Sequence, residues 1–296
     1  MSDPFSVVLR ALGTRSVRGT GLEASGDWAL AFDGRARLKF VALMRGRCWL
    51  ILPDSPPVAL TEGDVFLLSN TRYTVASDPL IEPVDGTALY ASPGQDLVRL
   101  GKERETVMIG GGSGFEEGSA AFVLDALPSF LRVDRASPKA EAIARTLASL
   151  QTEVSQGEMG GSIIAERLAE ILVVEAVRAY VATVPSDRVG WITALAEPRI
   201  GMALTMMHSA PAQRWTVPEL AAAVGMSRSA FAQRFSACVG TPPLDYLTSW
   251  RMVLAQRKLK AGQAIAAIAE EVGYSSQSAF AHAFKRTTGL TPRSGR

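Results

Sequence analysis

Two segments in the last third of the chain place polar side chains opposite a phenylalanine pair. Phe231 and Phe235 are four residues apart, as are Phe280 and Phe284, so each pair lies on one face of a helix and leaves its neighbours on the other. The outward polar side chains are Arg228, Ser229, Gln233 and Ser236 in the first segment, and Gln277, Ser278, His282 and Lys285 in the second, with Arg286 nearby. In a DNA major groove, Arg pairs with guanine, Gln with adenine, and Ser with either.

These side chains divide into two expected roles. We expect Arg228, Ser229 and Gln233 to contact base edges in one groove segment, and Gln277, Ser278 and His282 to do so in the next. The best candidates for phosphate contacts are Arg228, Arg234, Arg251, Lys285 and Arg286.

Each outward-facing segment is the second helix of a predicted helix-turn-helix. Residues 216–240 and 264–289 nearly repeat one another, and each copy has a short helix, a glycine turn and the phenylalanine helix. In the first copy, Thr216 and Glu219 have the spacing of a capping box, Gly225 supplies a positive φ, and Ser227 caps the next helix.

The second copy lacks the capping residues of the first. Ala264 stands where the first copy has Thr216, and Ala267 where it has Glu219. Losing such a cap costs about 0.5–2 kcal/mol, so we expect the second helix-turn-helix to open more readily. Between the copies, residues 244–260 predict one long helix that holds the two recognition helices about 34 Å apart, one duplex turn.

Charge is unevenly divided along the 296 residues. Residues 201–296 hold 11 Lys and Arg against 4 Asp and Glu, whereas residues 1–200 hold 20 against 25. The repeat therefore lies in the basic part, as binding to a phosphate backbone requires.

The first part of the chain predicts a different fold. Short apolar runs at 37–44, 48–52, 65–68 and 73–75 are separated by turn residues, which is typical of an antiparallel β-barrel or sandwich over residues 1–135. The glycines of 110–114 lack the rest of a phosphate-loop motif, so we interpret them as a flexible connection between strands. The predicted class is thus multidomain α+β.

From residue 138 the apolar spacing becomes helical. Ile143, Leu147, Leu150 and Val154 form one stripe, and a second helix follows. The second stripe comprises Ile163, Ile164, Leu168, Ile171, Leu172 and Val177. We expect 136–188 to be a helical linker, with one stripe on the barrel and the other on a second subunit as a homodimer hypothesis, and 189–296 to be the DNA-binding domain.

Metal chemistry in the barrel has no ligands to support it. A metal site in such a barrel needs about two or three His and a carboxylate, whereas the two histidines, His208 and His282, both lie outside residues 1–135. We therefore predict no metal and no cofactor. A small-molecule effector inside the barrel is a weaker hypothesis, with Lys39, Trp49, Arg72 and Tyr73 as candidate lining residues.

The remaining features favour a protein of the cytoplasm that is not inserted in a membrane. No apolar run reaches the length of a membrane span, and the first residues lack a signal-peptide pattern. Cys48 in an apolar run is interpreted as a core residue, and Cys238 has no nearby partner.

At these residues the sequence resembles the AraC/XylS family of bacterial transcription regulators. The resemblance covers about 190–296 and rests on Leu220-Ala-x-x-x-Gly-Met-Ser, Phe231-x-x-x-Phe, Gly240-Thr-Pro-Pro, Tyr246-Leu-x-x-Trp-Arg-Met, Ile268-Ala-x-x-Val-Gly-Tyr, Phe280-x-x-x-Phe-Lys and Gly289-Leu-Thr-Pro. Leu124-Asp-Ala-Leu-Pro and Leu195-Ala-Glu-Pro-Arg-Ile-Gly resemble one branch with a cupin-like, jelly-roll N-terminal domain. The resemblance implies effector-responsive binding of double-stranded promoter DNA and, for an activator, contact with RNA polymerase. The chain departs from the family at Gly295, where an aromatic residue is usual.

Three other functions remain as alternatives. A metal-independent cupin-fold enzyme with a DNA-binding appendage would also explain the two halves. A DNA-repair methyl acceptor would need a reactive Cys in a proline-flanked site, which neither cysteine has. An architectural DNA binder would show no response to an effector. We predict a sequence-specific regulator and no enzyme activity.

Overall fold

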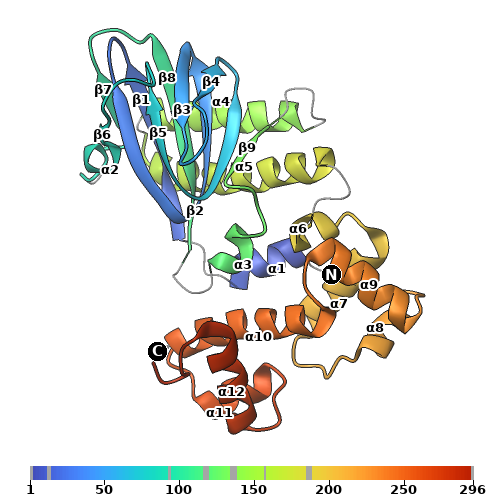
Figure 1. The fold of residues 1–296 in the computed structure, drawn as a ribbon. Coiled ribbons are helices and arrows are strands. Elements are labelled where there is room, and N and C mark those ends of the chain that lie inside the picture. The colour runs from blue at the N-terminus through green and yellow to red at the C-terminus, as the bar shows by residue number, and fades with distance from the viewer. Residues whose placement is uncertain are drawn as a thin grey trace. The chain divides into compact units, whose positions relative to one another are not determined.

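The computed structural model places the protein in two compact units (Figure 1). Residues 15–114 and 128–183 form one, here the sheet unit, and residues 1–14, 115–127 and 184–296 form the other, here the helical unit. The structure describes residues 3–11, 15–92, 95–115, 120–133, 139–156, 158–184 and 189–294. Gly295 lies outside these ranges.

Within its described residues the sheet unit contains nine strands. They are β1 (Arg15–Ala24), β2 (Ala29–Arg45), β3 (Arg47–Ile51), β4 (Val58–Thr61), β5 (Val65–Ala76), β6 (Val84–Asp85), β7 (Leu97–Leu100), β8 (Thr106–Gly114) and β9 (Phe130–Arg132), with a short helix α2 (Gly86–Leu89). The main path runs β4-β3-β5-β2-β8-β1-β7, with β6 on β2 and β9 on β5. The predicted sheet-rich domain is confirmed, but the described strands do not close a barrel. Two pairs, β1 with β7 and β2 with β6, are parallel.

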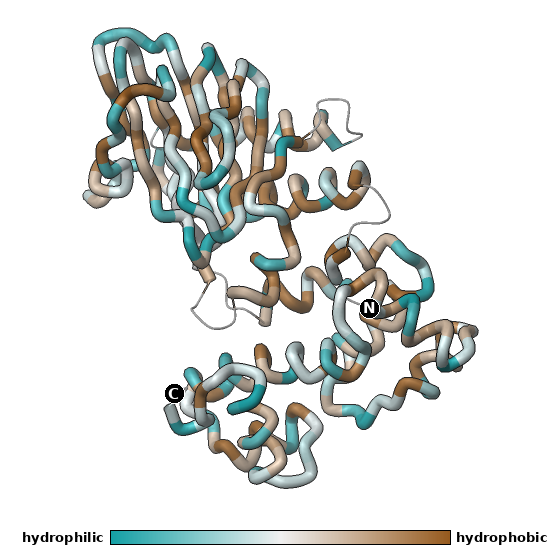
Figure 2. The backbone as a smooth tube through the Cα atoms, viewed as in Figure 1, coloured by the Kyte–Doolittle hydropathy of each residue, from teal (hydrophilic) through white to brown (hydrophobic). Residues whose placement is uncertain are grey.

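Successive side chains of a strand point to opposite faces of the sheet, and apolar residues, brown in Figure 2, recur along the strands. Val41 and Leu43 of β2 join an inner core with Leu50, Phe66 and Val75. The intervening residues of β2 lie on the opposite face, which helices α4 (Ala140–Gln156) and α5 (Gly161–Thr183) cover (Figure 1). Phe40 is one of them, and it is fully buried.

The glycines of 110–114 belong to strand β8, so the prediction of a flexible connection is wrong. A Cβ on Gly111 would lie 2.8 Å from both the Ala169 Cβ of α5 and the Phe40 ring. The absence of side chains therefore lets α5 lie close against β8, which a reading of glycine as a turn signal does not reveal.

The two helices bury different kinds of residue. In α4, three members of the predicted stripe, Ile143, Leu147 and Leu150, are buried, and the fourth, Val154, is half-buried. In α5, Leu172 and Val177 are buried, but the small residues Ala165, Ala169 and Ala176 complete the covered face. Of the other predicted members, Leu168 is half-buried, and Ile163, Ile164 and Ile171 are exposed, at 64%, 45% and 47%.

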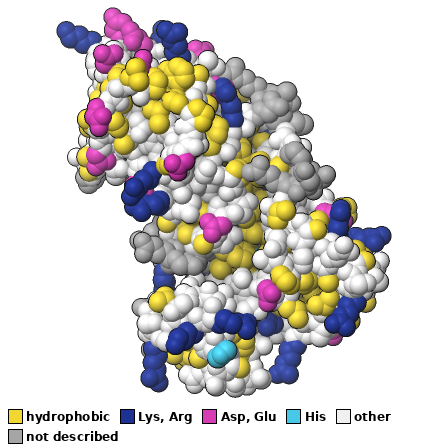
Figure 3. Space-filling model, viewed as in Figure 1, with side chains coloured by type: hydrophobic (Ala, Val, Ile, Leu, Met, Phe, Trp, Pro, Cys, Tyr) yellow, Lys and Arg dark blue, Asp and Glu magenta, His cyan; other side chains and the backbone are white. Residues whose placement is uncertain are grey.

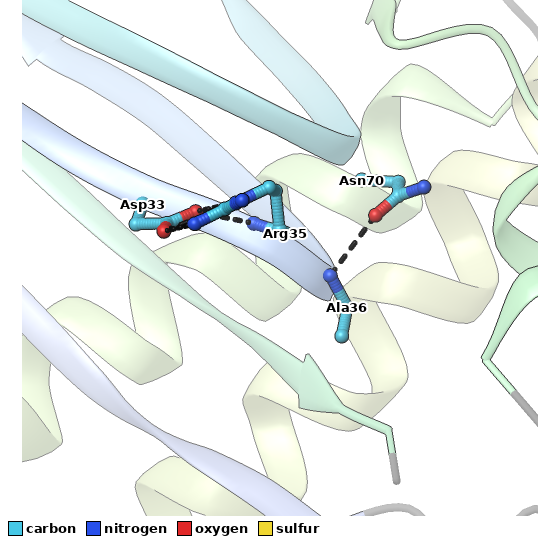
Figure 4. Close-up of polar contacts among 4 residues, drawn as sticks. All are labelled: Asp33, Arg35, Ala36 and Asn70. Carbon is cyan, nitrogen blue, oxygen red and sulfur yellow. Dashed lines mark hydrogen bonds and ion pairs between the residues drawn. The ribbon is translucent and has the colours of Figure 1, made fainter. Parts of the chain in front are cut away.

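A kinked position in β2 is fixed by a side chain of β5 (Figure 4). The pairing of β2 with β5 shifts between Gly34 and Leu38. Ala36 has φ 54° and Asn70 φ 50°, and the Ala36 N–H donates to the Asn70 Oδ1 at 3.0 Å. The bond satisfies a donor that the bulge would otherwise leave unpaired.

The helical unit draws its helices from three parts of the chain. They are α1 (Pro4–Ala11), α3 (Ala121–Leu124), α6 (Trp191–Ala194), α7 (Pro198–Ser209), α8 (Val217–Ala223), α9 (Arg228–Val239), α10 (Pro243–Lys260), α11 (Ile265–Glu271) and α12 (Gln277–Thr288). The expected regions 1–135, 136–188 and 189–296 do not coincide with these two units. Both α1 and α3 come from the region expected to be β structure, whereas α4 and α5 of the expected linker belong with the sheet.

An aromatic cluster explains why α3 belongs to the helical unit. The Phe122 ring lies 5.4 Å from Trp191, 5.6 Å from Tyr246 and 5.5 Å from Trp250, measured between centroids. The Trp191 Nε1–H donates to the Phe122 carbonyl at 2.8 Å. His208 lies within the same cluster, and its Nε2 is hydrogen-bonded to the Tyr246 hydroxyl at 2.7 Å. His208 is 4% exposed and is therefore part of the core of the helical unit.

Candidate nucleic-acid interface

The first helix-turn-helix has the local structure that its sequence predicts. The Thr216 Oγ1 accepts from the Glu219 N–H at 3.3 Å, and the Glu219 carboxylate accepts from the Thr216 N–H at 2.8 Å, which completes the capping box. Gly225 has φ 66°, and the Ser227 Oγ accepts from the Ala230 N–H at 3.3 Å. These contacts fix where α8 ends and where α9 begins.

The second copy repeats this geometry without the first cap. Helix α11 begins after Ala264, which makes no side-chain cap, whereas the Ser276 Oγ accepts from the Ala279 N–H at 3.1 Å before α12. Phe280 and Phe284 are fully buried, as Phe231 and Phe235 are in α9. The predicted difference in capping between the copies is therefore confirmed.

The predicted contact residues of α9 and α12 all have exposed side chains. These are Arg228, Ser229, Gln233, Arg234, Gln277, Ser278, His282, Lys285 and Arg286. Among the charged side chains of the helical unit, Lys and Arg (dark blue) predominate on the face shown in Figure 3. The fold thus presents two polar, basic helix faces in one unit, each backed by a buried phenylalanine pair.

Arg251 is placed differently from the other predicted contact residues. It is half-buried in α10, its Nε donates to the Pro211 carbonyl at 2.7 Å, and its Nη2 donates to the Gln213 carbonyl at 2.8 Å. Its guanidinium carbon lies 5.7 Å from the centre of the Tyr274 ring. Burial lowers the pKa of this guanidinium, and Tyr274 acts in the opposite direction. These contacts hold Arg251 to the protein, which the helical pattern of α10 did not predict.

The candidate effector residues do not lie together. Lys39 and Tyr73 line a small cavity of ≈ 30 Å³ within the sheet, and the Lys39 Nζ lies 4.9 Å from the Phe32 ring centre and 5.7 Å from that of Tyr73. Trp49 and Arg72 do not line this cavity. Trp49 follows the inward-facing Cys48, and Arg72 precedes the inward-facing Tyr73. Because side chains alternate along a strand, Trp49 and Arg72 point to the other face of the sheet.

Neither histidine has the surroundings of a metal ligand. Burial lowers the pKa of His208 to about 3. Within the described ranges, no group of three or more His, Cys, Asp or Glu residues is arranged to hold a metal ion. Nor does any helix in this part of the chain have the length and apolar character needed to cross a membrane.

Cys48 lies in the inner core of the sheet unit, as predicted. It is 2% exposed, and its Sγ lies 3.9 Å from the Met108 Sδ. Burial, with a smaller effect of Asp64, raises the pKa of its thiol to about 12. Cys238 is half-buried at the end of α9.

Comparison with known proteins connects both units to one family. The model of the cupin family matches residues 3–182, and that of a helix-turn-helix domain matches residues 220–296. An AraC-like transcription regulator of Streptomyces antibioticus is 41% identical over 293 residues, covering 98% of this chain and 97% of that protein. The chain belongs to the AraC-like transcription regulators.

Further relatives of this AraC-like protein are regulators too. One from Streptomyces lividans is 41% identical over 98% of this chain and 96% of its own. The HTH-type transcriptional regulator AlkR of Acinetobacter baylyi is 31% identical over 92% of each chain. The predicted function, a DNA-binding transcription regulator, is confirmed, and the comparisons give the cupin-enzyme alternative no support.

Proposed function

We propose that this regulator reads two successive major-groove segments with α9 and α12. Arg228, Ser229 and Gln233 would contact bases in one segment, and Gln277, Ser278 and His282 in the other. Arg234, Lys285 and Arg286 would bind phosphates. Of the phosphate candidates, Arg251 is left out because its Nε and Nη2 already donate to carbonyl groups of the protein.

The observation that carries the proposal is the matched pair of helix faces. Each recognition helix begins at a serine cap and buries two phenylalanines, so the same helical positions are exposed in both. Helix α10 connects the two motifs and has 18 residues, which corresponds to a length of about 27 Å. A rigid connection of this size suits two readers on one face of a duplex, where successive turns are about 34 Å apart.

Selection from a random duplex library by the full-length protein tests the proposal. Two enriched blocks about 10 base pairs apart, recovered at two salt concentrations, are expected. Binding that is only salt-sensitive and enriches no sequence would contradict reading by two helices.

Gln233 provides a residue-level test. If it makes a bidentate base contact, Gln233→Ala should cost about 1–3 kcal/mol and relax preference at one base pair. Cys238 on the same helix is half-buried and carries no proposed contact, so Cys238→Ala is a matched control. A loss that is uniform across sequences would assign Gln233 to positioning instead.

Sensing of a small molecule by the sheet unit is the second part of the proposal. It is supported by Lys39, a cation that faces the sheet interior among Phe32 and Tyr73. A cavity of ≈ 30 Å³ is close to the size of one water, so a larger effector would require side chains to move. We expect Lys39→Met to abolish any response to an anionic effector while leaving effector-free DNA binding intact.

A homodimer through α5 is the third part. The exposed Ile163, Ile164 and Ile171 support it, because the sheet already covers the opposite face of this helix. Light scattering at micromolar concentration should give twice the chain mass, and a monomer mass would contradict this part. If the regulator is an activator, it would also contact RNA polymerase.

A further inference from the structure

The loop between α7 and α8 carries an exposed arginine that the helical repeat does not include. Arg214 is exposed and lines a surface hollow of ≈ 480 Å³ together with Ser275, Ser276 and Gln277 at the start of α12. It is the one Lys or Arg among the described lining residues, and Glu270 is the one acid. Arg214 thus lies outside the two helix-turn-helix motifs but beside α12, the recognition helix of the second motif.

Arg251 holds this loop in place. Its guanidinium donates to the carbonyls of Pro211 and Gln213, on either side of Ala212. The loop also closes on itself, since the Trp215 Nε1–H donates to the Ala210 carbonyl at 3.1 Å. Arg214 therefore projects from a backbone that is anchored on both sides, which reduces the entropy lost when its side chain binds.

The turn of the second motif is packed against the same loop. A Cβ on Gly273 would lie 2.5 Å from the Ala212 carbonyl oxygen and 2.9 Å from the Arg251 Nη2. Gly225, at the equivalent turn of the first motif, has open space around that position. Both glycines have positive φ, so the close packing distinguishes the second turn alone.

We propose that Arg214 is a further DNA-binding residue, which contacts a backbone phosphate beside the segment read by α12, and that Arg251 is its positioning residue. This inference rests on the proposed reading by α12. It would give the weakly capped second motif a phosphate contact that does not depend on α11. A guanidinium suits this role because its planar donors match phosphate geometry.

The decisive experiment compares Arg214→Ala with the wild-type full-length protein on its selected duplex. One phosphate contact contributes a factor of about eight at 0.1 M salt and about 0.9 to the slope of log K against log salt. We expect Arg214→Ala to lose this factor in affinity and this part of the slope, to the same extent for selected and unrelated sequences. Unchanged affinity and slope would overturn the inference. Failure of the wild-type protein to bind any duplex would instead overturn the proposed function.

Arg199→Ala is the matched control. Arg199 is also exposed but lies in the first turn of α7, at the end of the helix remote from this loop, so its removal should leave the slope unchanged. An equal fall in slope for both variants would show a general effect of net charge and overturn the assignment to Arg214.

The positioning role of Arg251 needs a conservative replacement. Arg251→Lys keeps the charge but cannot donate to both carbonyls in the same geometry, so we expect it to reproduce the loss seen for Arg214→Ala. The double variant should be no weaker than either single one. Retention of the full salt slope in Arg251→Lys, or additive losses, would overturn the positioning role.

Discussion

Phe122 provides the strongest test of how the helical unit is built. It follows strand β8 in the sequence, yet its ring packs on Trp191, Tyr246 and Trp250 of the helical unit. Removing a core phenylalanine ring costs about 3–5 kcal/mol. Because Phe122 is only half-buried, we expect Phe122→Ala to destabilise the helical unit by about 3 kcal/mol, the lower end of that range.

Native-state amide exchange can locate this loss. A change of about 3 kcal/mol corresponds to a little over 100-fold in the opening equilibrium, so protection of α7 and α10 should fall by that factor. Protection of β5 in the sheet unit should change little. Phe130→Ala is a matched control, because Phe130 is also half-buried but packs on Phe66 at 5.9 Å in the sheet unit.

The pattern across these variants decides the outcome. We expect Phe130→Ala to lower the amide protection of β5 and to leave that of α10 unchanged, which is the reverse of the pattern for Phe122→Ala. A fragment of residues 189–296 lacks Phe122 and also Phe5, whose ring lies 6.4 Å from that of Trp191 between centroids. The fragment should show the same loss in α7 and α10 as Phe122→Ala or a greater one. If the fragment is as protected as the full chain, α3 is no part of this core and the reasoning is refuted.

Three further predictions follow from individual residues. Because burial holds the pKa of His208 at about 3, below that of an unfolded His at about 6.5, the neutral form stabilises the fold above pH 6.5. Stability should fall by up to about 1.4 kcal/mol per pH unit as the pH drops from 6 towards 3, and the difference from His208→Gln in denaturant titrations isolates this part. Amides of 265–272 should exchange faster than those of 217–224, since only the first motif has a capping box, and equal or greater protection of 265–272 would contradict this. Since burial raises the pKa of Cys48 to about 12, a thiol reagent at pH 8 should label Cys238 first and Cys48 only after unfolding; rapid labelling of both would show that the inner core opens.

Much of the DNA-binding surface follows from local sequence alone. The capping box at Thr216, the turn at Gly225 and the spacing of Phe231 and Phe235 fix the helix ends and the buried face. Because Phe231 and Phe235 define the buried face of the helix, Gln233 must lie on the exposed face. Such features depend on contacts within about four residues, which is why the sequence predicts them.

Tertiary structure decided the features that depend on distant partners. Arg251 fits the pattern of a phosphate contact until the loop at 211–213 places two carbonyls against it. Arg72 and Tyr73 must face opposite sides of β5, but only the packing of the sheet decides that Tyr73, and not Arg72, lines the cavity. The glycines of β8 predict a loop from sequence alone, whereas in the structure they allow α5 to pack closely against the strand. In each case the deciding contact comes from residues remote in sequence, whose approach neither composition nor periodicity specifies.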